Sequence, residues 1–273
     1  AIRDPLWSRG LGDVYKRQHK FKLDMEGNKM IYKKLILVTG IFILFSCGED
    51  MPPSLENFNL DQDVFESGKS LTSLPYGLHD LESSTSTEET LLIGVHGSNS
   101  RGYEWVYPLQ KLNHSTNLVS FFRWDDDSCP SPSVNNLLLS IKAKLDQSPN
   151  LNKVVLLGHS YGGLLVTSFS EVWDIDVPLQ IHSIAGPLKG MDGLSSLCDY
   201  QMPNSLRAGT NLHQWRTIQE LDGAFKDLSY DPQVVEINGS TATRLPETYK
   251  GNKLGHNWSI SWVADELNKN SLN

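Results

Sequence analysis

One serine stands in a pattern that would make it a nucleophile. Ser160 occupies the centre of Gly158-His-Ser-Tyr-Gly162, directly after the apolar run 153–157 and directly before a helical pattern. Where a strand turns straight into a helix, the positions that flank the central residue must lack side chains, and Gly158 and Gly162 meet that demand. Such a turn strains the serine backbone and projects its hydroxyl from the end of the strand. The sequence therefore predicts that Ser160 attacks a substrate.

The base that a serine hydroxyl requires is expected late in the chain. His256 lies in Leu254-Gly-His-Asn-Trp258 and is the only histidine that follows His213. Gly255 beside it suits a loop that turns the imidazole ring inward. A surface histidine near the end of the chain is the alternative interpretation. With a nucleophile upstream, the pattern favours His256 as the general base.

An acid must orient that base, and Asp222 is the main candidate. It lies between Ser160 and His256 in the chain, in an Asp-Gly turn that follows the expected strand 214–219. An ordinary Asp-Gly turn is the alternative interpretation. Three other acidic residues remain candidates for the same role: Glu220, Asp192 and Asp199.

Two backbone N–H groups are expected to stabilise the oxyanion that forms during attack. One belongs to Tyr161, directly after the serine, and the other to Ser98, in the loop 96–100 after an expected strand. His96 begins this loop but precedes the serine in the chain. It is therefore expected to shape the loop and not to act as the base.

Charge and motifs exclude several classes of function. The 273 residues carry a net charge of −8, which argues against nucleic-acid binding because that function needs a basic surface. The sequence contains no metal-ligand motif, phosphate-binding loop or dinucleotide fingerprint, so neither a cofactor nor a metal is expected. The acidic run 125–127 lacks ligand spacing and is interpreted as a solvated turn. His182 is interpreted as a buried structural histidine.

Strand and helix patterns alternate from residue 90 onward. Apolar runs predict strands at 90–96, 117–124, 153–157, 179–185, 213–219 and 233–237. Helical spacing predicts helices at 132–145 and 162–173, and a short helix or loop at 105–112. The alternation predicts an α/β fold with a mostly parallel central sheet, helices on both faces and the active site at the carboxyl ends of the strands. The N-terminal half of the sheet is expected to be reduced.

These motifs resemble those of the α/β-hydrolase superfamily, and most of all those of bacterial serine esterases and lipases. Val95-His-Gly97 is similar to the strand end that carries the oxyanion donor, and Gly158-His-Ser-Tyr-Gly-Gly163 to the turn that carries the nucleophile, called the nucleophile elbow. Ala185-Gly-Pro-Leu-Lys-Gly190 is similar, with two departures, to a lipase segment written T-P-H-x-G. Asp222 and His256 match the order of the family's acid and base.

The resemblance spans residues 90–262 and implies the α/β-hydrolase fold. It also implies hydrolysis of carboxylic esters through an acyl-enzyme, with Ser160, Asp222 and His256 as a triad and without a cofactor. An amidase, thioesterase or peptidase on the same fold, a phospholipase that remodels membranes, and a non-catalytic surface-binding lipoprotein remain alternatives. The segment 187–212 is expected to be either a lid or a crossover connection. The oligomeric state is not predicted.

Four segments are expected along the chain. They are a non-native leader at 1–29, a lipoprotein signal peptide at 30–46, a tether with N-terminal loops at 47–89, and a catalytic domain at 90–273. The leader is set apart because residues 12–18 resemble translated cloning sequence.

The signal peptide points to lipid anchoring. Lys33 and Lys34 precede the apolar run 35–45, which is too short to span a bilayer comfortably. The run ends in Leu44-Phe-Ser-Cys47, which resembles the bacterial lipobox whose cysteine becomes lipid-modified. An ordinary signal peptide or an anchor helix is the alternative. The expected partners are thus a membrane, through Cys47, and a small-molecule or lipid ester. The expected location is the bacterial cell envelope, at the outer membrane or cell surface.

Two further cysteines, Cys129 and Cys198, could form a disulfide or remain free thiols. An exported protein sits where disulfides persist, but the sequence does not decide between the two states.

Overall fold

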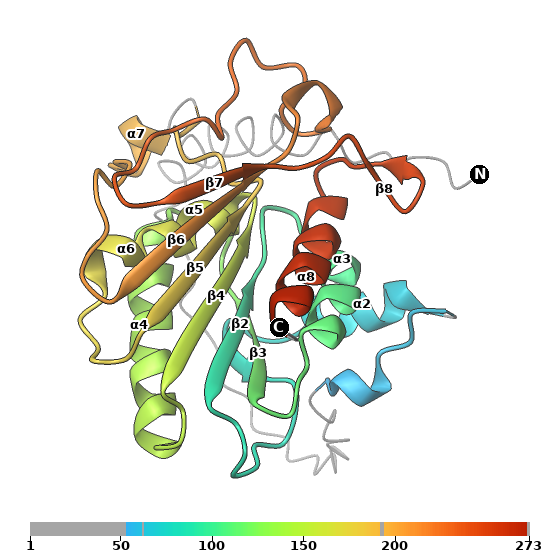
Figure 1. Ribbon diagram of the computed structural model, residues 1–273, viewed down its shortest axis with the longest axis vertical. Helices are drawn as coiled ribbons and strands as arrows, with labels where there is room; N and C mark the ends of the chain where they lie inside the picture. Colours follow the sequence, from blue (N-terminus) through green and yellow to red (C-terminus); the bar gives the residue numbers. More distant parts are fainter. Residues whose placement is uncertain (1–52, 62, 192–193, 272–273) are drawn as a thin grey trace, which may run out of the picture. The chain divides into compact units, whose positions relative to one another are not determined.

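The computed structural model describes residues 53–61, 63–191 and 194–271 (Figure 1). The predicted leader, the signal peptide, Cys47 and Asp192 lie outside the described residues. Among those described, no helix is both long and apolar enough to cross a bilayer.

A twisted seven-stranded sheet organises the described chain, and it confirms the predicted fold class. Its strands lie in the order β1-β3-β2-β4-β5-β6-β7, and every pair is parallel except β1 with β3. The bounds are β1 (Gly77–Asp80), β2 (Thr90–Val95), β3 (Asn117–Arg123), β4 (Lys153–His159), β5 (Leu179–Ile184), β6 (Thr210–Arg216) and β7 (Thr241–Arg244). A separate two-stranded hairpin joins β8 (Thr248–Tyr249) to β9 (Asn252–Lys253). The chain thus has the α/β-hydrolase fold, with one antiparallel strand at its N-terminal edge.

Helices cover both faces of this sheet (Figure 1). On one face lie α4 (Pro130–Gln147), α5 (Tyr161–Thr167) and α6 (Phe169–Val172), and on the other lie α2 (Val64–Thr72), α3 (Tyr103–Lys111) and α8 (Trp258–Ser271). The remaining short helices are η1 (Leu55–Asn57), α7 (Leu194–Leu197) and η2 (Gln219–Leu221). Both faces of the central strands are therefore buried, which explains why these strands are continuous apolar runs.

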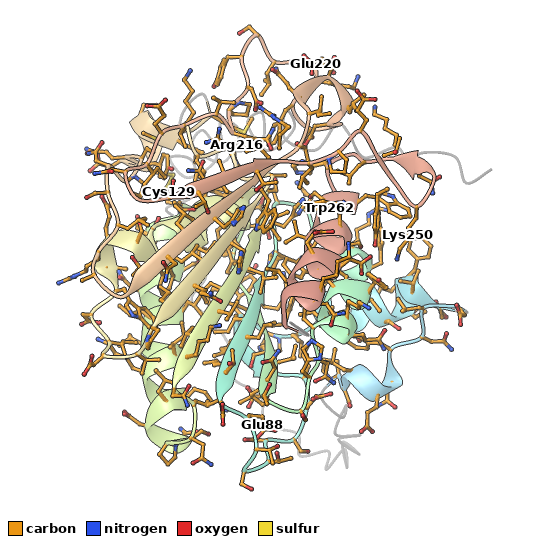
Figure 2. The ribbon with its side chains drawn as sticks, in the orientation of Figure 1. Glu88, Cys129, Arg216, Glu220, Lys250 and Trp262 are labelled. Atoms are coloured by element: carbon orange, nitrogen blue, oxygen red, sulfur yellow. A yellow bond between two sulfur atoms is a disulfide. The ribbon has the colours of Figure 1, made fainter. Side chains whose placement is uncertain are left out.

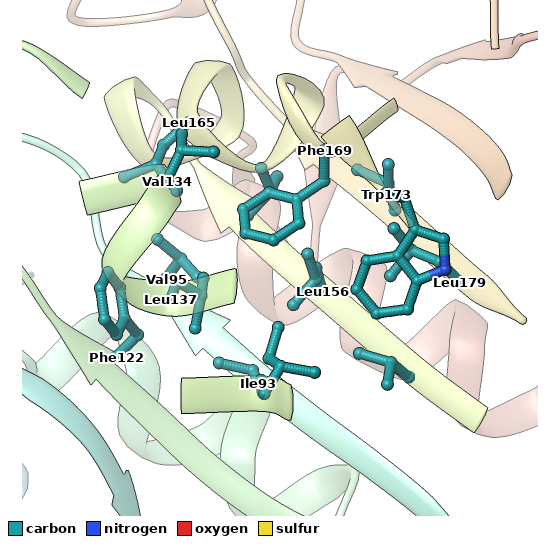
Figure 3. Close-up of a cluster of buried hydrophobic side chains, with 14 of the residues drawn as sticks. Ile93, Val95, Phe122, Val134, Leu137, Leu156, Leu165, Phe169, Trp173 and Leu179 are labelled. Carbon is teal, nitrogen blue, oxygen red and sulfur yellow. The ribbon is translucent and has the colours of Figure 1, made fainter. Parts of the chain in front are cut away.

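Alternate residues of the strands feed two separate cores. Along β4, Val154 and Leu156 pack with Phe169 on the side of α4 and α5, as Figure 3 shows for Leu156 and Phe169. Val155 and Leu157 join the second core, beneath α3 and α8. This period of two is the packing that a strand imposes. It holds the carboxyl end of β4, and hence Ser160, between two rigid layers.

Three expectations about the elements were wrong. The predicted strand at 233–237 does not form, and β7 begins at Thr241. The segment 47–89, expected to be loops, contains η1, α2 and the edge strand β1 within its described residues. The predicted helix 162–173 is divided into α5 and α6 at Ser168.

Val235 and Ile237 explain the first of these errors. Both are buried against the core from an irregular stretch of chain, so their alternation imitates a strand. The polar strand β1 was missed for the opposite reason. It is only half-buried along its length at the sheet edge, so it carries no apolar run.

Candidate active site

Ser160 lies at the tight turn between β4 and α5. Its φ of 54° and ψ of −121° are a strained conformation for a residue with a side chain. A Cβ on Gly158 would lie 2.2 Å from the carbonyl oxygen of Gly162, and a Cβ on Gly162 would lie 2.3 Å from the carbonyl oxygen of His96. The two glycines are therefore a steric requirement of the elbow, as the sequence pattern predicts.

The structure brings Asp222 and His256 together beyond the carboxyl end of β6. The Nδ1–H of His256 donates to Oδ2 of Asp222 at 2.9 Å, and the Asp222 side chain is fully buried. The N–H of Ala224 donates to Oδ1 at 2.8 Å, and the hydroxyl of Thr217 donates to Oδ2. Burial alone would raise the pKa of Asp222, but the His256 ring and these two donors together lower it. Asp222 is thus a buried carboxylate that fixes the ring of His256.

Gln233 supports this pair from behind, through Thr217. Its side-chain oxygen accepts the N–H of Thr217 at 2.8 Å, and its side-chain nitrogen donates to the carbonyl of Thr217 at 3.1 Å. Arg244 on β7 donates to the same carbonyl. Sequence reasoning missed these three residues because no motif joins them. Thr217 lies inside the expected strand 213–219, so its position gave no signal of this role; in the structure it directly follows β6.

His159, directly before Ser160, contacts the loop that carries His256. Its Nε2–H donates to the backbone carbonyl of His256 at 3.1 Å, and the two ring centroids are 4.6 Å apart. Burial first, and then the neighbouring His256 ring, hold the pKa of His159 well below its usual range. A neutral histidine directly before Ser160 therefore joins the loop of His256 to the turn that carries Ser160. On the far side, the edge of Phe225 packs against the His256 ring at 5.0 Å.

The predicted oxyanion donors come from two segments that meet at the nucleophile. A Cβ on Gly97 would lie 2.8 Å from the Cβ of Ser160, so the loop after β2 packs directly on the elbow. Ser98 follows Gly97 in this loop. Tyr161 is the first residue of α5, and the first N–H groups of a helix have no partner within the helix. Both predicted donors thus belong to segments that adjoin Ser160.

His96 shapes this loop, as the sequence suggests. Its Nδ1–H donates to the carbonyl of Gly97 at 2.9 Å, while Nε2 accepts from the guanidinium of Arg123 at 2.8 Å and from the N–H of Trp124 at 3.3 Å. Burial, with the Arg123 charge adding to it, lowers the pKa of His96 to about 3. The ring is therefore a neutral structural group and has no vacant nitrogen with which to act as a base.

Of the other candidate acids, the described part of the chain contains Glu220 and Asp199, and neither hydrogen-bonds to His256 there. Glu220 is exposed in η2, at the top of Figure 2, and Asp199 is exposed with a φ of 51°. His182 is a buried core residue, as expected, and its Nδ1 accepts the indole N–H of Trp215 at 3.1 Å. Within the described part of the chain, no group of three His, Cys, Asp or Glu could hold a metal ion.

A disulfide fastens the segment 187–212 beside the site. Cys129, at the start of α4 (Figure 2), is bonded to Cys198, which follows α7. Near the same point, the hydroxyl of Tyr200 donates to the carbonyl of Leu188 at 2.8 Å. The segment is thus held to α4 by a covalent bond, which limits how far a lid formed from it could move.

Comparison with known proteins finds likeness only among solved structures. No family model and no curated protein matches the chain. Est1E from Butyrivibrio proteoclasticus is 14% identical, with 71% of this chain and 91% of that chain covered at a TM-score of 0.46. The esterase Pf2001 from Pyrococcus furiosus is 14% identical, with 68% and 82% covered at a TM-score of 0.44. The esterase domain of a Rhodothermus marinus protein is 12% identical, with 71% and 90% covered at a TM-score of 0.47. Identities this low say nothing about substrate, so function must be inferred from this chain's own residues.

Proposed function

We propose that the chain is a serine hydrolase that cleaves carboxylic esters, an esterase or lipase, through an acyl-enzyme. The observation that carries the proposal is the hydrogen bond from His256 to the buried Asp222, on a loop that His159 joins to the turn of the strained Ser160. Because Nδ1 of His256 donates to Asp222, Nε2 is the nitrogen left to accept a proton. A serine, a base and an orienting acid are the groups that nucleophilic acyl transfer requires.

In the first half of the reaction, Nε2 of His256 removes the hydroxyl proton of Ser160 while Oγ bonds to the ester carbonyl carbon. The N–H groups of Ser98 and Tyr161 stabilise the resulting oxyanion. The carbonyl then re-forms, the bond to the leaving oxygen breaks, and His256 returns the proton to that oxygen. The alcohol leaves and an acyl-Ser160 remains.

In the second half, His256 removes a proton from water and the hydroxide attacks the acyl carbonyl. Collapse of this intermediate breaks the bond to Oγ, and Oγ recovers its proton from His256. Asp222 stabilises the charged imidazolium in both halves and keeps the ring in one tautomer. Water is the only co-reactant, so the scheme needs no cofactor.

The same residues would also serve an amidase, a thioesterase or a peptidase, because the leaving group is selected by pocket shape. A non-catalytic binding protein that keeps the fold is the alternative from another class. A serine-directed phosphonate separates these classes. Labelling of Ser160 supports any of the enzymes, whereas a folded chain that is not labelled supports the binding protein.

The decisive experiment is hydrolysis of p-nitrophenyl esters from acetate to palmitate by the chain from residue 48 onward. Ser160→Ala should lose about 10⁴-fold or more of kcat, as removal of such a nucleophile does elsewhere. Ser168→Ala, further along the same turn-and-helix segment, is the matched control and should keep wild-type activity. Equal activity of wild type and Ser160→Ala would overturn the proposal. The optimal acyl length then separates esterase from lipase.

We also propose that Cys47 carries a lipid anchor in the bacterial cell envelope, on the basis of the sequence 30–47 alone. Expression of the full chain in a bacterium fed a radiolabelled fatty acid should label the protein. Cys47→Ser should abolish the label and release the protein from the membrane fraction. A labelled Cys47→Ser variant would contradict the proposal.

A further inference from the structure

The loop between β2 and α3, residues 97–102, is here called the oxyanion loop because it carries Ser98. Its backbone is left-handed at two positions after Ser98. Asn99 has a φ of 53° and Gly102 a φ of 79°. A left-handed conformation at a non-glycine residue is costly, and it persists only where the surroundings hold it in place. The position of the Ser98 N–H therefore depends on what secures the residues that follow it.

Asp126 secures the loop from the side of β3. Its Oδ2 accepts the backbone N–H of Asn99 at 2.6 Å. A hydrogen bond to an ionised carboxylate is shorter and stronger than a neutral one. Burial raises the pKa of Asp126, and the Asn99 N–H partly offsets that rise. The acidic run 125–127 is therefore more than a solvated turn, since its central carboxylate binds the peptide directly after Ser98.

The segment that carries Asp126 is itself fixed to the nucleophile. The carbonyl of Ser128 accepts the hydroxyl of Tyr161 at 3.1 Å, and Cys129 is held by the disulfide to Cys198. The ring of Tyr161 also packs on Trp124 at 5.0 Å. Asp126 thus extends from a rigid wall of the site to the oxyanion loop.

Glu104, in the first turn of α3, secures the next residue of the loop, Ser100. Its side chain is buried, with the residue only 8% exposed, and Oε1 accepts the hydroxyl of Ser100. The same Ser100 oxygen accepts the N–H of Gly102 at 3.2 Å. Burial raises the pKa of Glu104, and the Ser100 hydroxyl and nearby backbone N–H groups lower it in part. Burying a carboxyl group is costly unless it holds a partner; here the Ser100 hydroxyl is the partner of Oε1, while Oε2 is buried with no hydrogen bond from the described residues.

We infer that Asp126 and Glu104 are positioning residues that clamp the oxyanion loop at Asn99 and Ser100 and so aim the N–H of Ser98 at the substrate carbonyl. The inference rests on the proposed function. Removing one oxyanion donor in serine hydrolases costs about 10²–10³ in kcat. If one of the two contacts is removed, the loop still carries the Ser98 N–H but no longer holds it in a fixed direction. The loss in kcat should therefore be smaller than the loss caused by removing the donor itself.

The test uses Asp126→Ala and the shape-conserving Asp126→Asn, with Asp127→Asn as the matched control. Asp127 is the exposed neighbour in the same turn, so its variant removes one charge from the same loop. Amide hydrogen exchange of the native protein is measured first, on a peptide that covers 97–102. The Asn99 amide in Asp126→Ala should exchange about tenfold faster or more, as loss of a charged acceptor implies, and Asp127→Asn should match the wild type. Unchanged exchange in Asp126→Ala overturns the clamp.

Kinetics on a p-nitrophenyl ester then test the link to catalysis. Asp126→Ala should lower kcat by about 10- to 100-fold with KM nearly unchanged. Asp126→Asn, whose side-chain oxygen still accepts the Asn99 N–H, should recover most of kcat. Phosphonate labelling of Ser160 should slow in parallel, since phosphonylation also develops charge at the oxyanion site. Faster exchange with unchanged kcat would overturn the inference, because the loop would then be clamped for another purpose.

The exchange measurement does not depend on ester hydrolysis. If the wild type neither hydrolyses esters nor reacts with the phosphonate, the proposed function fails, while the exchange rates still support or overturn the clamp. Glu104→Gln is measured in the same way. Its unfolding midpoint shows whether a change reflects the loop or the whole domain.

Discussion

The predicted nucleophile, Ser160, and the predicted acid–base pair, Asp222 and His256, are held in place by different physical means. Around Ser160, backbone packs against backbone, with no room for a Cβ at Gly158 or Gly162. Around His256, side-chain hydrogen bonds provide the support, through Asp222 and the residues behind it. Gly255, beside His256, is not confined in the way that Gly158 and Gly162 are. A Cβ on Gly255 would approach only the Leu221 carbonyl oxygen, at 3.4 Å.

This difference has consequences for how each half responds to change. Steric repulsion rises steeply at short range. A Cβ 2.3 Å from a carbonyl oxygen cannot be accommodated unless the backbone moves. Hydrogen bonds act side chain by side chain, each contributing about 1 kcal/mol, or more where a charge is involved. We call the turn at Gly158–Gly162 the nucleophile half, and Asp222, His256 and their hydrogen-bond partners the acid–base half. A substitution in the nucleophile half should therefore abolish folding or have little effect, whereas substitutions in the acid–base half should reduce activity in steps.

The largest expected effect is on folding, in Gly162→Ala. The added methyl would collide with the carbonyls of Val95 and His96, where β2 ends. We expect the variant to lose more than about 4 kcal/mol of unfolding free energy, or to fail to accumulate as folded protein. Gly255→Ala should stay within about 1 kcal/mol of wild type. Urea denaturation of both variants measures the contrast, and equal losses would show that the two halves are not held differently.

Asp222→Asn should have the largest effect on rate in the acid–base half. An amide in place of the carboxylate can donate to Nδ1 of His256 and so favour the wrong tautomer, which costs about 10⁴ in kcat in a serine protease. Because asparagine keeps the shape of aspartate, near-ultraviolet circular dichroism should remain that of the wild type. Glu220→Gln is the control, as it removes a nearby exposed carboxylate. A comparable loss in Glu220→Gln would count against Asp222 as the acid.

The same contrast explains what the sequence could predict. The residues that the turn at Ser160 requires are close together in the sequence, so Gly158, Ser160 and Gly162 are recognisable as a motif. The alternating strands were predictable because burial on both faces leaves continuous apolar runs. Asp222 and His256 are 34 residues apart, and only the order of the chain suggested them.

Gln233 shows why the rest was not predictable. Its side-chain amide binds both the N–H and the carbonyl of Thr217, as a neighbouring strand's backbone would. The segment that follows Gln233 is buried at alternate residues, Val235 and Ile237, although it forms no strand. Their apolar spacing is the reason that a strand was wrongly predicted at 233–237. Asp126 and Glu104 were missed because an acidic turn and a buried glutamate look ordinary until their partners in the oxyanion loop are known.

Acid should act on the buried histidines before it acts on Asp222. His96 and His159, which adjoin Ser160 from two sides, have a pKa depressed by burial, to about 3 for His96. An unfolded histidine takes up a proton below about pH 6.5, which these folded ones resist. Their contribution to stability is thus complete above about pH 6.5 and is lost as the pH falls below that value, toward about 3 for His96. The loss is about 1.4 kcal/mol per pH unit for each group.

Asp222 responds in a different window. Its pKa is lowered in the folded chain, so its contribution to stability is present above about pH 3.9 and is lost only as the pH falls below that value.

Urea unfolding between pH 7 and pH 4.5 tests the contribution of the buried histidines. The free energy of unfolding should fall as the pH is lowered through this range. His182→Gln, which removes a remote histidine whose pKa burial lowers to about 3, should reduce the slope by about 1.4 kcal/mol per pH unit. A flat profile in the wild type would show that the buried histidines take up protons in the folded state.

The smallest effect, and the sharpest test of stepwise loss, comes from Thr217. Thr217→Val keeps the shape of the side chain but removes the hydroxyl that donates to Asp222 Oδ2. The loss of one donor to a charged acceptor should lower kcat/KM by about tenfold, far less than Asp222→Asn does. Thr217→Ser restores the hydroxyl and should recover the rate to within about twofold. A loss in Thr217→Val as large as that in Asp222→Asn would mean that the acid–base half, like the elbow, fails all at once. Its hydrogen bonds would then act as a single cooperative unit.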